Sequence, residues 1–242
     1  MKDERWILAK IKEKAEELGL SFNRRIFIAN WVTKNEANII SYLTPSPKYD
    51  KFGKTKQQRA NNLGRFLRSR ELREMDAKGL VVNKKSILDA IRMINDPLHR
   101  KMIEKPANKF KFNSQGYAPV VSRSEAGLED SYDVLFHEWI HALLNHNKLG
   151  FYDTGGNRWK YSEGLTIFVE YYLGNYYGFD TGVLKGRYEL VKKHGEKTSY
   201  DKLLKYFNIF AKLLENEKTP TGRKEILVHY FRDFPAPRRT KF

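Results

Sequence analysis

The sequence predicts an α+β protein that is mostly helical, and three observations support this prediction. Apolar residues recur at helical spacing near the N-terminus and through much of the second half of the chain. Short runs rich in β-branched and aromatic side chains lie mainly in the first half, which indicates a small sheet. The 242 residues are 40% hydrophobic and 14% aromatic, so the chain can bury a sizeable core and global disorder is excluded.

The elements of the first half follow from local patterns. An amphipathic helix is expected over residues 4–18, and two strands are expected over 26–33 and 38–43. Residues 44–62 are rich in proline, glycine and polar side chains, which predicts a loop and a candidate internal boundary. Residues 63–78 predict a basic helix.

Capping residues and periodicity define the remaining expected elements. In order, they are a helix over 87–95 capped by Ser86 and ended by Pro97, a strand over 117–122, a helix over 132–146 capped by Ser131, a helix over 163–174 capped by Ser162, an amphipathic helix over 201–215, and a last helix from Thr219-Pro220 to about residue 232.

Composition excludes several classes of protein. No apolar run approaches the roughly 20 residues that a membrane-spanning helix needs. The N-terminal residues MKDERWILAKIKEKAEELG carry charges within their apolar patch, so they do not resemble a secretory signal and a cytoplasmic location is expected. The chain has no cysteine, which excludes disulfides and thiolate ligands. Any metal ion must therefore be bound by His, Asp or Glu.

Charge is unevenly distributed along the chain, whose net charge is +16. Residues 51–110 hold 16 basic and 6 acidic side chains, whereas residues 111–180 hold 5 basic and 9 acidic ones. Such a basic segment can attract nucleic acid or another polyanion. The alternative is a solvated, lysine-rich surface, since no nucleic-acid-binding motif accompanies the charge.

Residues 137–141 read His-Glu-Trp-Ile-His, within an apolar segment that predicts a buried helix. Positions four apart lie one turn apart on the same helix face, so His137 and His141 can direct a ring nitrogen at one ion. Two imidazoles suit Zn²⁺, and Glu138 lies beside the ion, where a carboxylate can act as general base. The alternative is a buried helix with two structural histidines.

A catalytic zinc site needs a third protein ligand and leaves one position for water. Glu163 follows His141 by 22 residues and opens the next expected helix. Gly155 and Gly156 lie in the turn between the two helices, so an antiparallel return can bring Glu163 to the same ion.

The segments HEWIH and WKYSEGLTIFVEYYLG together resemble the gluzincin zinc peptidases, particularly their aminopeptidase-type pattern of Trp, then Asn/Ser-Glu-Gly, then a second Glu. The resemblance covers roughly residues 132–175. It implies a zinc metallopeptidase that acts on protein or peptide substrates, with one Zn²⁺ per chain. It makes His137, His141 and Glu163 the ligands, and it makes Glu138 the base that helps zinc-activated water attack the peptide carbonyl.

The resemblance also implies a zincin-like fold, with a small sheet in an N-terminal lobe and a helical C-terminal lobe. Residues 1–110 would form the basic upper lobe and residues 111–242 the catalytic lobe. The strand over 117–122 would be the edge strand that receives an extended substrate by β-augmentation.

The chain departs from the family pattern at several points. It lacks the Gly-x-Met-Glu-Asn element with which aminopeptidases hold a substrate amine, so an endopeptidase is expected. Thr166 stands where some gluzincins carry an Asp that orients a ligand histidine. Glu170 is a candidate partner of the metal ligands, or else a surface or capping carboxylate. His229 and Tyr230 are candidates for stabilising the oxyanion.

Two further alternatives stay open. His146 fits the HExxH-ALL-x-H run of the repressor-cleaving peptidases of mobile elements, whereas the Trp-x-x-Ser-Glu-Gly segment favours the aminopeptidase-like pattern. The alternative function is a nucleic-acid- or polyanion-binding protein in which the zincin-like segment is a non-catalytic scaffold. Glu138 discriminates between the two functions, because a structural zinc site has no use for an unliganded carboxylate there.

Overall fold

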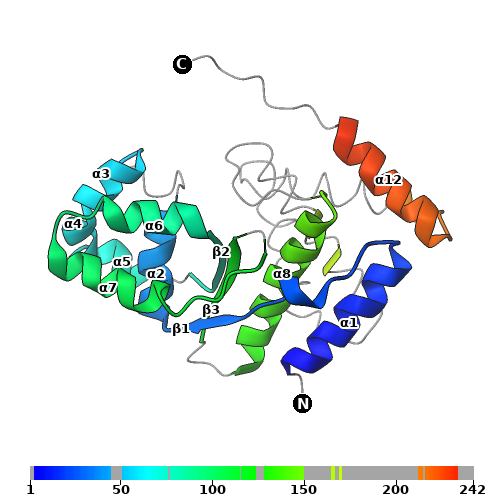
Figure 1. Ribbon diagram of the computed structural model, residues 1–242, viewed down its shortest axis with the longest axis horizontal. Coiled ribbons are helices and arrows are strands. Elements are labelled where there is room, and N and C mark those ends of the chain that lie inside the picture. The colour runs from blue at the N-terminus through cyan, green and yellow to red at the C-terminus, as the bar shows by residue number, and fades with distance from the viewer. Residues whose placement is uncertain are drawn as a thin grey trace. The chain divides into compact units, whose positions relative to one another are not determined.

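The computed structural model describes residues 3–44, 51–75, 77–114, 116–123, 128–149, 165–166, 169–170, 212–214 and 216–233. Over these residues the protein is α+β and mostly helical, as predicted, with a small three-stranded sheet. None of the helices described in these ranges is long and apolar enough to cross a membrane. In chain order the elements are α1 (Glu4–Glu17), η1 (Arg24–Ile26), β1 (Asn30–Val32), α2 (Lys34–Leu43), α3 (Lys56–Asn61), α4 (Leu63–Leu67), α5 (Arg70–Glu74), β2 (Gly79–Asn83), α6 (Lys84–Arg92), α7 (Pro97–Ala107), β3 (Tyr117–Ser122), α8 (Leu128–His146) and α12 (Pro220–Asp233) (Figure 1).

The chain forms two compact units. Residues 25–139 make up one, here called the sheet unit, and residues 1–24 with 140–242 make up the other, here called the terminal unit. The division falls inside α8, which is one continuous helix. The two units are defined by how the residues pack, not by function. The functional boundary expected at residue 110 therefore stays a prediction.

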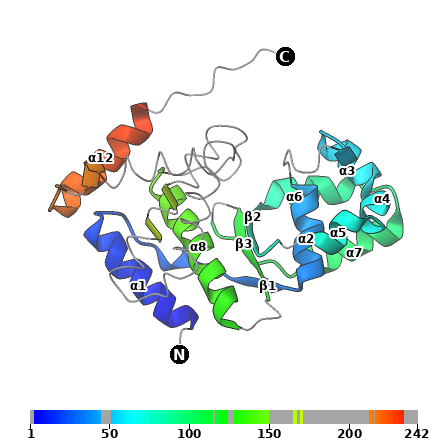
Figure 2. The same ribbon diagram turned by 180° about the vertical axis from the view of Figure 1, so that it is seen from behind.

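The sheet unit is built around the strand order β1-β3-β2. β1 runs parallel to β3, and β2 runs antiparallel to it with Leu80 opposite Val120 and Val82 opposite Ala118. Because side chains alternate along a strand, these four residues share one face. That face packs into the main apolar cluster with residues of α2, α6 and α7, which gather on one side of the sheet (Figure 2).

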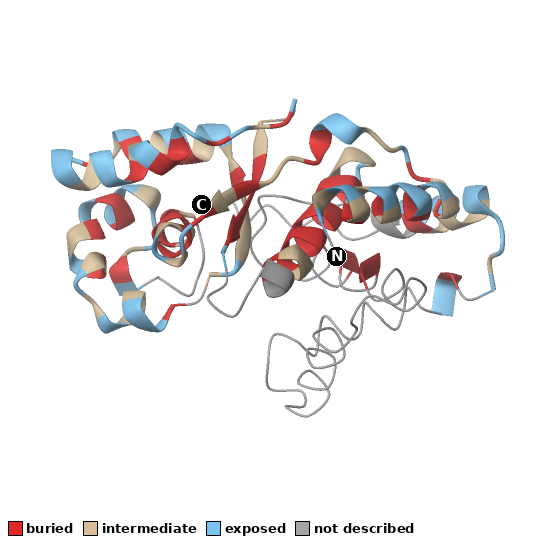
Figure 3. Ribbon diagram, turned by 90° about the horizontal axis from the view of Figure 1, so that it is seen from below, coloured by how far each residue is buried: buried red, intermediate tan, exposed pale blue. Residues whose placement is uncertain are grey.

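Three stacked or edge-on aromatic rings form part of this cluster. Tyr42 stacks on Phe66 with ring centroids 3.9 Å apart, and Phe52 meets both rings edge-on. All three side chains are buried. Burial raises the pKa of Tyr42 to about 12, so its hydroxyl stays protonated and donates to the Arg59 carbonyl. Figure 3 shows buried residues on the strands, beside intermediate ones, and along one side of several helices.

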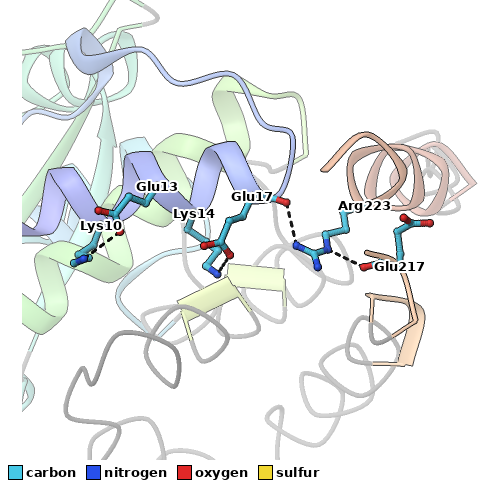
Figure 4. Close-up of polar contacts among 6 residues, drawn as sticks. All are labelled: Lys10, Glu13, Lys14, Glu17, Glu217 and Arg223. Atoms are coloured by element: carbon cyan, nitrogen blue, oxygen red, sulfur yellow. Dashed lines mark hydrogen bonds and ion pairs between the residues drawn. The ribbon is translucent and has the colours of Figure 1, made fainter. Parts of the chain in front are cut away.

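The terminal unit joins the two ends of the chain through α1 and α12. Arg223 of α12 donates to the carbonyl of Glu17, at the end of α1, and to the carbonyl of Glu217 (Figure 4). Lys14 is fully buried and pairs with Glu17. Desolvation lowers the pKa of the Lys14 ammonium, and the hydrogen bond with Glu17 acts in the opposite direction.

The strand expected over 38–43 is wrong, because these residues complete helix α2. Thr33 and Glu36 form a capping box, in which each side chain accepts a hydrogen bond from the other residue's backbone N–H. This cap starts a helix ahead of the β-branched pair Ile39-Ile40, and packing on the sheet buries that pair within it. The strand expected over 26–33 is confirmed only as β1.

The structure also differs from the expected elements at other boundaries. Asn83, not Ser86, caps α6. Pro97 is the first residue of α7, after the cap Asp96, whereas the sequence predicted only that it ends a helix. The loop expected over 44–62 contains α3, which Thr55 caps. The helix expected over 63–78 is divided into α4 and α5, and the residues directly after it form strand β2, which was not predicted from the sequence.

Several elements are confirmed: the helix over 4–18, the strand over 117–122 and the helix that begins at Pro220. Helix α8 starts at Leu128, so Ser131 is not its cap; the Ser131 hydroxyl instead donates to the Ser122 carbonyl. Most of the helices expected over 163–174 and 201–215 lies outside the described residues.

We expect Arg59→Met to destabilise the sheet unit. The guanidinium of Arg59 is buried and donates to the carbonyls of Gly53, Tyr42 and Thr44. Methionine keeps much of the volume but leaves buried carbonyls without donors, which lowers the free energy of unfolding by about 2 to 3 kcal/mol. Urea unfolding measures this, and Arg73→Met, at an exposed position of α5, is the control and should cost about 0.5 kcal/mol or less. Equal losses in the two variants would contradict the role of Arg59.

Candidate metal centre

The histidine motif lies in the middle of α8, in a stretch of the helix that is buried on nearly every side. Leu135, Ile140 and Leu143 are completely buried, and Trp139 is almost so. A helix that is apolar all round belongs in a protein core, so the folded chain encloses this segment. His137, Glu138 and His141 are the exceptions in composition, yet they are buried too, with 9%, 6% and 8% of their surfaces exposed.

The sheet unit holds the first part of α8 at several points. The Trp139 indole N–H donates to the Ile28 carbonyl at 3.2 Å, and its ring meets Phe27 edge-on at 5.7 Å. Nearer the start of the helix, Tyr132 meets Trp31 of β1 edge-on at 5.6 Å. These contacts fix both the position and the rotation of the segment that carries His137 and Glu138.

Strand β2 approaches α8 most closely at Gly79. A Cβ atom at this position would lie 2.4 Å from Cγ1 of Val134 and 2.7 Å from Oε1 of Glu138. Both distances are too short for any side chain, so only glycine lets the strand lie this close to the helix. The Glu138 carboxylate is therefore packed directly beneath the backbone of β2. Sequence reasoning missed Gly79, and its only signal was a glycine at the start of a β-branched run.

His141 is oriented by a residue from the second of the two segments that resemble gluzincins. Thr166 is completely buried, and its Oγ1 lies 2.9 Å from Nδ1 of His141. If Nδ1 carries the proton, it donates to this hydroxyl, and a metal ion would be ligated through Nε2. This is the position at which the resemblance expects a residue that orients a ligand histidine.

Glu163, the expected third ligand, lies outside the described residues, so its role stays a prediction. Thr166, three residues later in the chain, is the nearest described residue that contacts the motif. Among the residues that the structure describes, no group of three or more His, Asp or Glu side chains could hold a metal ion, so the described donors are the two histidines of α8.

The other expected site residues have different outcomes. Glu170 is 4% exposed, so it is not a surface carboxylate, and its roles as a partner of the metal ligands or as a capping carboxylate stay predictions. His229 is exposed on α12, and the side chain of Tyr230 lies outside the described residues, so the oxyanion role of both stays a prediction. His146 is the last residue of α8.

The expectation that residues 117–122 form an edge strand is wrong. β3 is the central strand, and it pairs with β1 on one side and with β2 on the other. Both of its edges are therefore occupied and neither can receive a substrate. Within the described sheet, β2 pairs on one side only, and it is β2 that lies against Glu138.

No protein-family model, no curated protein and no solved structure matches the chain. Inference about its function therefore rests on the geometry of α8 and its neighbours.

We expect Gly79→Ala to destabilise the sheet unit by about 1 to 3 kcal/mol, because the added methyl forces β2 away from α8. The matched control is Gly64→Ala in α4, where the nearest atoms belong to the ring of His99, which can rotate away. A Cβ there would lie 2.7 Å from Cε1 of that ring, so the ring must shift, but alanine favours the helix and this variant should cost less than Gly79→Ala. Urea unfolding of both proteins checks the prediction, and a Gly79→Ala protein as stable as the wild type would show that the close approach is wrong.

Proposed function

We propose that this chain is a zinc-dependent metallopeptidase of the gluzincin type that cleaves peptide bonds as an endopeptidase. One observation carries the proposal: two buried histidines and a buried glutamate share one stretch of α8, and a buried threonine engages Nδ1 of the second histidine. Three polar side chains in an otherwise apolar, buried stretch depart from the pattern of the rest of that stretch, which favours a functional reason for their presence.

The donor set suits zinc. His137 and His141 would hold the ion with an imidazole nitrogen each, Glu163 would supply a carboxylate, and the fourth position would be left for water or substrate. When bound, zinc supplies a Lewis acid that polarises a peptide carbonyl and acidifies water. The contact with Thr166 is compatible with the fit, because the hydroxyl can accept a hydrogen bond from Nδ1 and leave Nε2 of His141 for the metal ion.

Glu138 is the proposed general base. Its carboxylate would take a proton from the attacking water and then return it to the amine that leaves when the peptide bond breaks. The packing of Gly79 above Glu138 confines the carboxylate, so it is positioned before substrate arrives. His229 and Tyr230 are the proposed donors to the oxyanion, and they would act by hydrogen bonding to the developing negative charge.

The substrate edge is β2, in place of the strand expected from the sequence. An extended peptide can add to the outer edge of this strand, and the backbone of β2 would bring the peptide over Glu138. β2 reads Gly-Leu-Val-Val-Asn and contains no acidic side chain with which to hold a substrate's amino terminus. This composition supports an endopeptidase over an aminopeptidase.

We expect the purified protein, supplied with zinc and dialysed, to retain about one zinc per chain. His141→Ala and Glu163→Ala should lose the metal, because each removes a ligand. Thr166→Val should weaken zinc affinity by about 10- to 100-fold, since it removes only the group that orients His141.

Elemental analysis and competition with a zinc-sensitive dye measure these effects. His146→Ala is the control and should retain zinc, because His146 lies outside the proposed ligand set. Zinc retained in the Glu163→Ala protein would exclude Glu163 as a ligand, and an absence of zinc in the wild type would refute the proposal.

Glu138→Gln should retain zinc but lower the rate of peptide cleavage by about 100-fold or more, because glutamine cannot accept the proton. The readout is mass spectrometry of a peptide library from a digested cell lysate, incubated with each protein. Glu104→Gln, on α7, is the matched control and should cleave like the wild type. If Glu138→Gln cleaved at the wild-type rate, the carboxylate would have no catalytic role.

A further inference from the structure

The sheet unit carries a hollow of about 410 Å³ at the corner between α4 and α5. Four cationic side chains line it: Lys51, before α3, Arg65 in α4, Arg68 at its end, and Arg70 in α5. All four are exposed. The one carboxylate in the lining is Glu71, so the hollow has a clear excess of positive charge.

Local ion pairs neutralise only part of this charge. Lys51 pairs with Glu71, and this hydrogen bond is the main reason that the pKa of the Glu71 carboxyl falls to about 2. Arg70 pairs with Glu74, which does not line the hollow. Within the described part of the chain, Arg65 and Arg68 form no ion pair, unlike Lys51 and Arg70. Two exposed guanidinium groups therefore face the hollow without a carboxylate partner there.

The base of the hollow is rigid. Phe52 lines it but is only 4% exposed, because its ring packs edge-on against Tyr42 and Phe66. The Lys51 ammonium lies 5.4 Å from the centre of the Phe52 ring, and the Arg65 guanidinium lies 5.8 Å from it. Both cations are thus held at one aromatic ring, which reduces the entropy that they would lose on binding an anion.

The residue types indicate a phosphate-bearing ligand. Arginine presents a planar fork of donors that matches phosphate oxygens, and it is less strongly hydrated than lysine. An apolar ligand would find little surface here, because the only large apolar side chain of the lining is nearly buried.

A second basic hollow favours a polymer over a single phosphate. It also measures about 410 Å³, and Lys84, Lys85 and Arg92 of α6 line it, with Asp89 as its only carboxylate. The Lys56 ammonium of α3 donates to the Ser86 hydroxyl of α6 at 2.7 Å, which joins the helix after Lys51 to the helix that lines the second hollow. Two basic hollows in one unit provide more than one position for a phosphate, which suits a ligand with repeated phosphates.

We propose that the hollow formed by Lys51, Arg65, Arg68 and Arg70 binds the phosphodiester backbone of nucleic acid without reading its sequence. The contacts are charges and arginine donors at the surface, which position a backbone but do not distinguish bases. This binding site is separate from the proposed peptidase chemistry and does not depend on it.

The test is fluorescence anisotropy with fluorescein-labelled 20-nucleotide single strands of DNA and of RNA, titrated with the 242-residue protein at salt concentrations from about 50 to 200 mM. We expect binding to both, with log affinity falling linearly as log salt rises. The double variant Arg65→Gln/Arg68→Gln should bind about tenfold or more weakly, because it loses two charged donors. Its salt slope should fall by about 1.4, since each phosphate contact on a single strand contributes about 0.7.

Lys101→Gln/Lys109→Gln is the matched control. It removes the same charge from exposed positions that line neither hollow, so its affinity should stay within about twofold of wild type. Urea unfolding confirms that both double variants are folded. A preference for RNA or for DNA identifies the natural ligand, and either result supports the site.

Three results would overturn the proposal. The wild type could fail to bind either strand at 50 mM salt. The two double variants could lose affinity equally, which would mean diffuse attraction by net charge. Polyglutamate could compete as well as an unlabelled strand of equal charge, which would identify an acidic protein as the partner instead of nucleic acid.

Discussion

The contact of β2 with α8 at Gly79 is the constraint on which the arrangement of the sheet unit depends. A strand can approach a helix this closely only where it presents a hydrogen atom in place of a side chain. β2 is paired with β3 along its whole length, and β3 is paired with β1, so the position of Gly79 sets the height of the entire sheet above the helix. The hydrogen bonds of Trp139 with Ile28 and of Ser131 with Ser122 then fix the orientation of α8 relative to the sheet.

This packing explains how α8 accommodates polar residues in its buried stretch. Most neighbours of the motif on the helix are apolar and contribute the free energy of burial, roughly 25 cal/mol for each Å² of apolar surface removed from water. Two histidines and a glutamate in the same stretch reduce that gain, because polar groups lose their hydration on burial. A pair of structural histidines would not require the carboxylate of Glu138, which is confined beside Gly79 in the same stretch.

Local signals in the sequence correctly predicted α1 and α12. They failed where a capping residue was overlooked, or where a contact between residues far apart in the sequence determines the secondary structure. The apolar stripe of α1 and the Pro220 start of α12 could be read directly from the sequence. The segment Ile39-Ile40 could not, because β-branched residues favour strands until the capping box at Thr33 and burial on the sheet override that preference. β2 is short and includes a glycine, which weakens its strand signal.

The candidate site shows the same limit. The histidines and the glutamate of α8 are recognisable because helical spacing alone relates them. The position of Glu138 beneath β2 could not be recognised from the sequence. Gly79 lies 59 residues before Glu138, and a contact between residues that far apart leaves no periodic pattern. The order of the strands was equally hidden. Pro119 has no N–H to donate and therefore favours an edge position for β3, yet β3 pairs on both sides and leaves β1 and β2 as the outer strands of the described sheet.

Thr166 gives the candidate centre a different electrostatic balance from the one that a carboxylate partner would give. Its hydroxyl can orient His141 through one hydrogen bond but adds no negative charge. With two neutral imidazoles as donors, the only ligand charge opposing a divalent cation would come from Glu163. In the proposed zinc site, Glu163 would therefore contribute a larger share of the affinity than a third ligand does beside a charged partner.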